Sequence, residues 1–150
     1  MAIRDVVKGE DNEDLRKISR EVKQITPHIL TLLDDMKETL LIEDGGGLAA
    51  PQVGVLRRIA VVSYEDKYYE LINPIILEES GEVSGEEGCL SVPEIWGLVP
   101  RPEKIKVSYT DRSAEKHEIE ISGMLARIFC HEIDHLDGIL FVDKMTEEIE

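Results

Sequence analysis

The segment His131-Glu132-Ile133-Asp134-His135 has the residue types and the spacing of a metal site. Two histidines four residues apart lie on one face of a helix, with β-carbons about 5–6 Å apart, so both imidazoles can bind one metal ion. A metal ion lowers the pKa of a bound water to about 7. A carboxylate such as that of Glu132 can then accept and return a proton. The segment predicts metal-assisted hydrolysis, although so short a pattern also occurs in ordinary helices.

A catalytic site of this kind usually has three protein ligands and one open position, so a third ligand is required. Downstream of His135 there is no further His or Cys, whereas common metalloproteases of the HExxH type place the third ligand there. Cys89 is the favoured upstream candidate, because a thiolate would complete a Cys/His/His set. Cys130 is the alternative, but on a helix it points about 100° away from His131. It is better explained as a small buried apolar residue.

Two helices are expected to position these side chains. Leu125, Ile128 and Phe129 recur at helical spacing and predict a helix over residues 123–137, which is closed by Gly138. An N-terminal helix begins at Pro27, with Thr26 as its cap, and ends in the Asp-Gly-Gly-Gly run at 44–47.

Strands are predicted at residues 59–62, 68–72, 75–77, 104–109, 117–121 and 139–142. Short strands with segregated helices favour the α+β class. The expected architecture is a set of mixed or antiparallel short-stranded sheets around a central helix that carries HExxH, with an additional N-terminal helix.

Length and charge restrict the remaining choices. The 150 residues suit a single domain spanning 1–150. The net charge of −15 repels phosphate backbones, so no direct nucleic-acid partner is expected. No apolar stretch approaches the roughly 20 residues that cross a bilayer, and no secretory signal opens the chain, so a cytoplasmic protein without membrane contact is expected. Two cysteines in such a protein are more often thiols or ligands than a disulfide.

Three segments together resemble the peptide deformylase family. The family pattern is a Gly-rich segment ending in Leu-Ala-Ala-x-Gln, then Glu-Gly-Cys-Leu-Ser, then His-Glu-x-Asp-His. This chain has these segments at residues 45–52, 87–91 and 131–135, in the same order. The resemblance covers nearly the whole chain, and the three motifs together are highly specific.

The resemblance implies a hydrolase that removes the N-terminal formyl group from formyl-methionyl nascent peptides and releases formate. By resemblance, Cys89, His131 and His135 would hold one divalent metal ion, with Fe²⁺ as the native ion and Zn²⁺ or Ni²⁺ as substitutes. Glu132 would act as general base and then as general acid. A transient contact with the ribosome is a further expectation.

The resemblance also assigns residues that bind substrate. The Gln52 amide and the Leu90 backbone N–H would stabilise the oxyanion. The backbone of three glycines would pair with an extended peptide, which gives affinity without reading side chains. These glycines are Gly46, Gly47 and Gly88.

An apolar pocket would take the methionine side chain. Met124, Leu125 and Ile128 are placed near it, although all three could equally be ordinary core. Glu87 and Arg101 resemble a family ion pair that would brace the Cys89 loop; otherwise they are plain surface charges.

Two other functions are weighed against the deformylase. One is a general zinc metallopeptidase, which lacks its usual downstream ligand here. The other is a catalytically silent metal- or peptide-binding module on the same fold, which the presence of both Glu132 and Gln52 does not favour. Hydrolysis of a formyl-Met tripeptide, compared with its acetyl analogue, separates the three.

Overall fold

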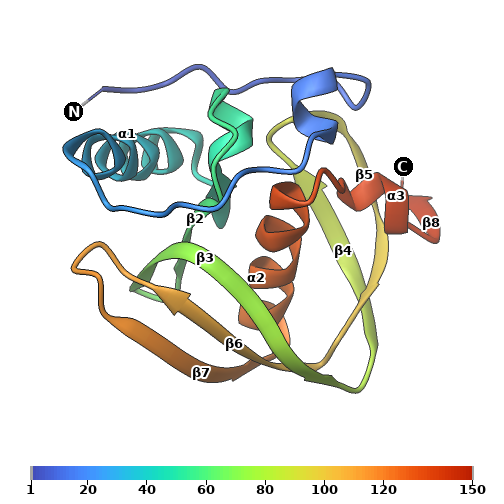
Figure 1. Ribbon diagram of the computed structural model, residues 1–150. Coiled ribbons are helices and arrows are strands. Elements are labelled where there is room, and N and C mark those ends of the chain that lie inside the picture. The colour runs from blue at the N-terminus through green and yellow to red at the C-terminus, as the bar shows by residue number, and fades with distance from the viewer. Residues whose placement is uncertain (1, 150) are drawn as a thin grey trace.

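Helix α2 (Gly123–Leu136) lies between two antiparallel sheets in the computed structural model, which describes residues 2–149 (Figure 1). The larger sheet has the order β1-β2-β3-β6-β7, and the smaller has the order β4-β5-β8. The strands are β1 (Gly47–Ala49), β2 (Ile59–Tyr64), β3 (Lys67–Ser80), β4 (Val83–Cys89), β5 (Val92–Arg101), β6 (Lys104–Thr110), β7 (Lys116–Ser122) and β8 (Glu147–Ile149). The α+β prediction is confirmed, and residues His131 to His135 lie on α2.

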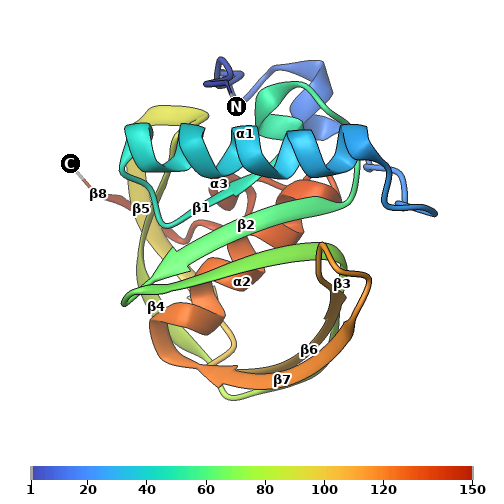
Figure 2. The same cartoon turned by 90° about the vertical axis from the view of Figure 1, so that its left-hand side faces the viewer.

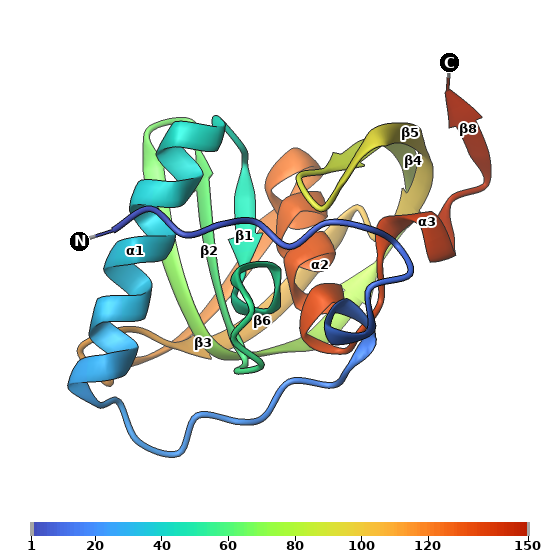
Figure 3. The ribbon, with the colours of Figure 1, turned by 90° about the horizontal axis from the view of Figure 1, so that it is seen from above.

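Strand β2 is buried on both faces, because alternate residues of a strand point to opposite sides. Ile59 and Val61 pack in the apolar cluster that contains the inner face of helix α1 (Pro27–Glu43), whereas Ala60 and Val62 pack in the cluster around α2. The helix α1 runs across the outer side of β1 and β2 (Figure 2), and the view from above shows these strands between the two helices (Figure 3). The strand β2 therefore lies between the two apolar clusters and packs against α2 with one of its faces.

The predicted start and end of α1 are confirmed. The Thr26 hydroxyl accepts a hydrogen bond from the backbone N–H of Ile29 at 3.3 Å, and Pro27 occupies the first helical position. The helix ends at Glu43, and the capping residue Asp44 has the left-handed conformation, with φ of 53°. The chain then enters β1, where Gly47 pairs with Val62 of β2. This abrupt end delivers the glycine segment to the side of α2.

Two strand predictions need correction. Residues 68–72 and 75–77 are not separate strands but parts of β3, which continues through a register shift between Ile72 and Ile75, where Asn73 has a φ of 51°. The strand predicted at 139–142 is wrong, because Phe141–Lys144 forms the single helical turn α3. An apolar run of four residues fits a buried turn as well as a strand. Here the Asp143 carboxylate accepts from the backbone N–H of Leu140 at 2.9 Å and favours the turn.

The sequence patterns did not reveal the smaller sheet. Strand β4 carries few apolar residues, yet it pairs with β5 along most of its length and ends at Cys89. The acidic segment Glu147–Ile149 forms β8 and pairs with Trp96–Leu98 of β5. Two one-turn 3₁₀ helices, Glu13–Arg16 and Ala50–Val53, complete the described elements. No helix among residues 2–149 is both long enough and apolar enough to cross a membrane.

Candidate active site

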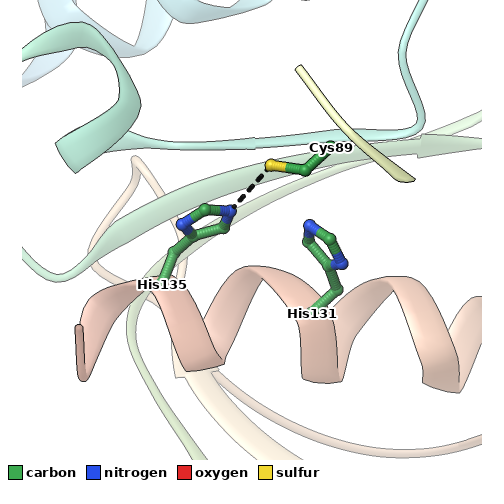
Figure 4. Close-up of side chains that lie close together, drawn as sticks. All are labelled: Cys89, His131 and His135. Atoms are coloured by element: carbon green, nitrogen blue, oxygen red, sulfur yellow. Dashed lines mark hydrogen bonds between the residues drawn. The ribbon is translucent and has the colours of Figure 1, made fainter. Parts of the chain in front are cut away.

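The side chains of Cys89, His131 and His135 converge between the two sheets. Cys89 ends β4, and both histidines lie on α2. One ligand atom from each residue lies within 4.8 Å of the others, and the Cys89 Sγ is 3.3 Å from Nε2 of His135. Figure 4 shows the three side chains directed toward one another. The structure thus brings together a thiol and two imidazoles that are 42 to 46 residues apart in the sequence.

The alternative cysteine lies elsewhere. Cys130 packs in the apolar core around α2 and is 4 % exposed. Burial raises the pKa of its thiol to about 11, which keeps it protonated. A buried neutral thiol behaves as a small apolar side chain. Both cysteines are free thiols, as expected.

The orientation of His131 is set by a carboxylate. Nδ1 of His131 lies 2.8 Å from Oε1 of Glu87, so a proton on Nδ1 points to Glu87 and leaves Nε2 to face Cys89 and His135. Such an outer carboxylate fixes the tautomer of a ligating histidine and increases its basicity. His135 is also buried, and burial together with the charges of His131 and Arg101 lowers its pKa well below the ordinary value. It is therefore neutral, as a metal ligand must be.

Glu132 lies beside the cluster and is almost fully buried. Burial raises the pKa of its carboxyl to about 7, against the opposing positive charge of His131. Its Oε1 has no hydrogen-bond partner among the described residues. A carboxyl group with a pKa near 7 can both accept and donate a proton at neutral pH, which general acid–base catalysis requires.

Gln52 is fixed with its amide N–H groups directed at the cluster. Its Oε1 accepts from the backbone N–H of Ala49 at 2.9 Å, and Nε2 donates to Oγ of Ser91 at 3.1 Å. Nε2 is also 3.5 Å from Sγ of Cys89. The contact with Ala49 decides which end of the amide is the oxygen, so the donor end faces the site. Leu90 follows Cys89 directly and is half-buried.

An open cleft of about 510 Å³ reaches Cys89, His131 and Glu132. Five of the six residues expected to contact substrate line it, namely Gly46, Gly47, Gly88, Met124 and Ile128. Leu125 instead packs against the core around α2 and is not among the lining residues. Met124 is 50 % exposed at the cleft wall, so it is not ordinary core.

Lys8, Trp96 and Arg127 are among the lining residues that escaped the sequence reasoning. Trp96 is the only tryptophan of the chain, and its ring fills the space where a β-carbon of Gly88 would lie, at 2.7 Å. The signal for Arg127 was a charged residue within the apolar pattern of α2, one helical turn before His131.

Glu87 and Arg101 form the expected ion pair, and they are not plain surface charges. The Arg101 Nε and one terminal nitrogen each donate to the Glu87 carboxylate at 2.9 Å, and both residues are buried. Burial alone would raise the pKa of Glu87, but hydrogen bonds from His131 and Arg101 outweigh it and lower this pKa to about 2. Glu87 therefore stays ionised and can hold the His131 ring.

The donor set fits a transition metal. One thiol sulfur and two imidazole nitrogens suit Zn²⁺, Fe²⁺ and Ni²⁺, whereas Mg²⁺ and Ca²⁺ prefer oxygen ligands. Burial lowers the pKa of His131, but the hydrogen bond with Cys89 and the negative charges of Glu132 and Glu87 outweigh it and raise this pKa to about 10. Metal binding at Nε2 would therefore release a proton.

A helix with HExxH beside an open cleft, and a cysteine that completes a ligand set with its histidines, define the class as a hydrolase of the α+β type. A family model described as polypeptide deformylase matches residues 3–149. The chain belongs to the peptide deformylase family, metalloenzymes that remove the N-terminal formyl group from nascent peptides.

Individual relatives agree with this membership. A peptide deformylase of Thermoanaerobacter pseudethanolicus is 54% identical over 144 residues, which cover 96% of this chain and 90% of that protein. The crystal structure of a peptide deformylase from Legionella pneumophila is 40% identical, with a TM-score of 0.93 over 97% of this chain and 87% of the other. A class I type b peptide deformylase from Acinetobacter baumannii with bound Met-Ala-Ser is 37% identical, with a TM-score of 0.92 over 96% of this chain and 99% of the other.

Proposed function

We propose that Cys89, His131 and His135 hold one divalent metal ion at the end of the cleft, and that this site hydrolyses the formyl group of N-formylmethionyl peptides. The observation that carries the proposal is the convergence of the three ligand atoms within 4.8 Å of one another. A metal ion bound there would lower the pKa of a bound water to about 7 and so supply a nucleophile at neutral pH.

Glu132 moves the proton. Its carboxylate accepts the proton of the attacking water and later returns it to the leaving amine of the peptide. The burial that raises its pKa to about 7 makes both transfers accessible at the same pH. Formate and a free α-amino group are the products.

Gln52 and Leu90 stabilise the negative charge that develops on the formyl oxygen. The Gln52 amide is held by Ala49 and Ser91, so its N–H donor needs no reorganisation during the reaction. Preorganised donors of this kind supply a large part of the rate enhancement in acyl-group hydrolysis. The backbone N–H of Leu90 is proposed as the second donor.

The peptide binds in the cleft as an added strand. Gly46, Gly47 and Gly88 offer backbone groups on its two sides. Main-chain pairing suits an enzyme that acts on many different nascent chains. The methionine side chain enters between Met124 and Ile128, and the bound Met-Ala-Ser of the Acinetobacter relative is a peptide with this first residue.

The finer assignments follow the family resemblance. We infer Fe²⁺ as the native ion, a cytoplasmic location where nascent chains emerge, a single catalytic domain over residues 1–150, and a transient contact with the ribosome. Metal analysis of protein purified without oxygen tests the ion, and co-sedimentation with ribosomes tests the contact.

Hydrolysis of formyl-Met-Ala-Ser, compared with acetyl-Met-Ala-Ser, tests the reaction. The expected result is stoichiometric formate from the formyl peptide, little acetate from its analogue and no cleavage between residues. Cleavage of internal peptide bonds would favour a general metallopeptidase. Absence of hydrolysis in metal-loaded protein would favour a silent binding module.

A further inference from the structure

Arg127 connects the two elements that carry the proposed metal ligands. It lies on α2 one turn before His131, and its side chain is only 9 % exposed. Helix residues four apart share a face, so Arg127 and His131 both face the β4–β5 hairpin. A guanidinium is costly to bury unless it is fully paired, so its partners indicate what it does.

The guanidinium holds both strands of the hairpin. One terminal nitrogen donates to the backbone carbonyl of Val99 on β5 at 2.7 Å and to Oε2 of Glu87 on β4 at 2.7 Å. The other donates to the backbone carbonyl of Val83 on β4 at 2.6 Å. Because two of these partners are main-chain atoms, Arg127 fixes the backbone of β4 and β5 against α2.

A glycine in β4 makes room for this contact. A β-carbon at Gly85 would lie 2.9 Å from the central carbon of the Arg127 guanidinium and 3.0 Å from two of its nitrogens. Any other residue at this strand position would therefore push the arginine away from Val83 and Val99. Gly85 and Arg127 form one packing unit.

The same contact reaches the ligands through Glu87. Oε2 of Glu87 accepts from Arg127, and Oε1 lies 2.8 Å from Nδ1 of His131. Cys89 follows two residues later on the same strand. Arg101 also donates to the Glu87 carboxylate, but Arg127 is the arginine that links this carboxylate to the backbone of both hairpin strands.

We propose that Arg127 is a positioning residue that holds the Cys89 end of β4 at ligand distance from His131 and His135. The inference rests on the proposed function of these three residues as metal ligands. Loss of outer partners of metal ligands typically costs about 10- to 100-fold in metal affinity or activity. Arg127 reaches His131 through Glu87 and Cys89 through the backbone of β4, so a loss within this range is expected.

Arg127→Met and Arg127→Lys test the proposal in the metal-loaded protein. Arg127→Met removes the charge and all donors, and Arg127→Lys keeps the charge without the planar fork. The matched control is Arg112→Met. Arg112 also joins a helix to a strand, through Asp34 on α1 and Glu70 on β3, but it does not line the active-site cleft.

Three measurements separate positioning from stability: the rate of Zn²⁺ release to excess chelator, the visible spectrum of the Co²⁺-loaded protein, and thermal unfolding of the metal-free protein. Arg127→Met is expected to release Zn²⁺ about 10 to 100 times faster and to change the Co²⁺ spectrum, with Arg127→Lys between it and the wild type. Arg112→Met is expected to lower the unfolding temperature without changing either metal readout.

Unchanged Zn²⁺ release and an unchanged Co²⁺ spectrum in Arg127→Met would overturn the proposal and leave a purely structural arginine. If that variant does not fold, wild-type release by Arg127→Lys overturns it equally. Metal release is measured without substrate, so wild-type protein that retains metal but fails to deformylate would contradict the proposed reaction and not the role of Arg127.

Discussion

Gly47 lies against the carboxylate of Glu132, and a β-carbon at Gly47 would be only 2.6 Å from Oε2 of that carboxylate. Cγ and Cδ of Glu132 would lie at 2.8 and 2.9 Å from the same point. The φ of Gly47 is not in the left-handed region, so space and not backbone conformation requires glycine here. The backbone of β1 therefore lies so close to the proposed general base that no side chain fits at position 47 without moving it.

Gly47→Ala is expected to displace the Glu132 carboxylate and to lower kcat by about 100-fold or more, in line with the loss of a positioned acid–base group. Because the added methyl group lies at the site and not in the core, thermal unfolding should change little. Gly46→Ala is the comparison, since its β-carbon would meet only the flexible end of Ile128 at 3.3 Å. It should alter KM more than kcat. Equal kcat values for the two variants would contradict this account.

Glu132→Gln should retain metal and lose about 10²- to 10⁴-fold in kcat. Glutamine keeps the shape of the side chain but cannot take a proton from water. Metal content and kcat are measured on the same preparation, so that metal loss is not mistaken for lost chemistry. Turnover within a few fold of the wild type would exclude Glu132 as the base.

Cys89→Ala and Cys130→Ala form a matched pair. Removing a direct ligand should lower metal affinity by more than about 100-fold, because even outer partners cost up to that factor. Cys130→Ala should keep the metal and lose only part of the packing of the α2 core. Chelator titrations and thermal unfolding measure the two effects. Metal loss in Cys130→Ala would show that the assignment of Cys89 as the third ligand is wrong.

Gln52→Ala should lower kcat by about 10²- to 10³-fold with little change in KM, the typical cost of one oxyanion donor. Gln52→Glu keeps the acceptor that Ala49 requires but replaces the donor, so it should be at least as slow. Ser91→Ala removes only an anchor of the Gln52 amide and should cost much less. An active Gln52→Glu enzyme would remove Gln52 from the mechanism.

Asp35 should make stability depend on pH at acidic values. This buried carboxylate accepts hydrogen bonds from the Ala2 backbone N–H at 2.7 Å and from Nε of Arg4 at 2.9 Å. Burial would raise its pKa, but these bonds outweigh burial and lower it below the ordinary value of 3.8. The folded state therefore binds this proton more weakly than the unfolded state. The stability it contributes is complete above about pH 4 and is lost as pH falls through the lowered pKa.

Asp35→Asn should accordingly reduce the free energy of unfolding by about 1 kcal/mol at pH 7. Urea unfolding between pH 2 and 7 should show the difference from the wild type shrinking below about pH 4. Asp5→Asn is the control, because Asp5 is exposed and has no hydrogen bond or ion pair among residues 2–149. A difference that stays constant over the whole range would show that the charge of Asp35 does not matter.

Local signals made much of this fold predictable. Thr26 and Pro27 define the start of α1 because capping depends only on neighbouring residues. The spacing of His131 and His135 defines one face of a helix for the same reason. The strand predicted at 139–142 failed because apolar residues in a short run record burial and not conformation.

Contacts between distant segments could not be predicted in this way. Strand β4 has few apolar residues, and only its pairing with β5 identifies it as a strand. Arg127 resembles any helical arginine until the carbonyls of Val83 and Val99 are placed beside it. Trp96 on β5 lines the cleft because Gly88 on β4 leaves space for its ring, and only the pairing of the two strands brings these residues together.

The location of Cys89 on one sheet edge and of both histidines on the central helix has a mechanical consequence. A single ion held by all three would cross-link β4 and α2, which otherwise meet through side chains. The bound ion would therefore stabilise the packing of the smaller sheet against the helix. Any ligand that binds only the folded chain increases its stability in proportion to RT ln(1 + [L]/Kd). Loss of the metal would thus lower the stability of the fold as well as stop the reaction.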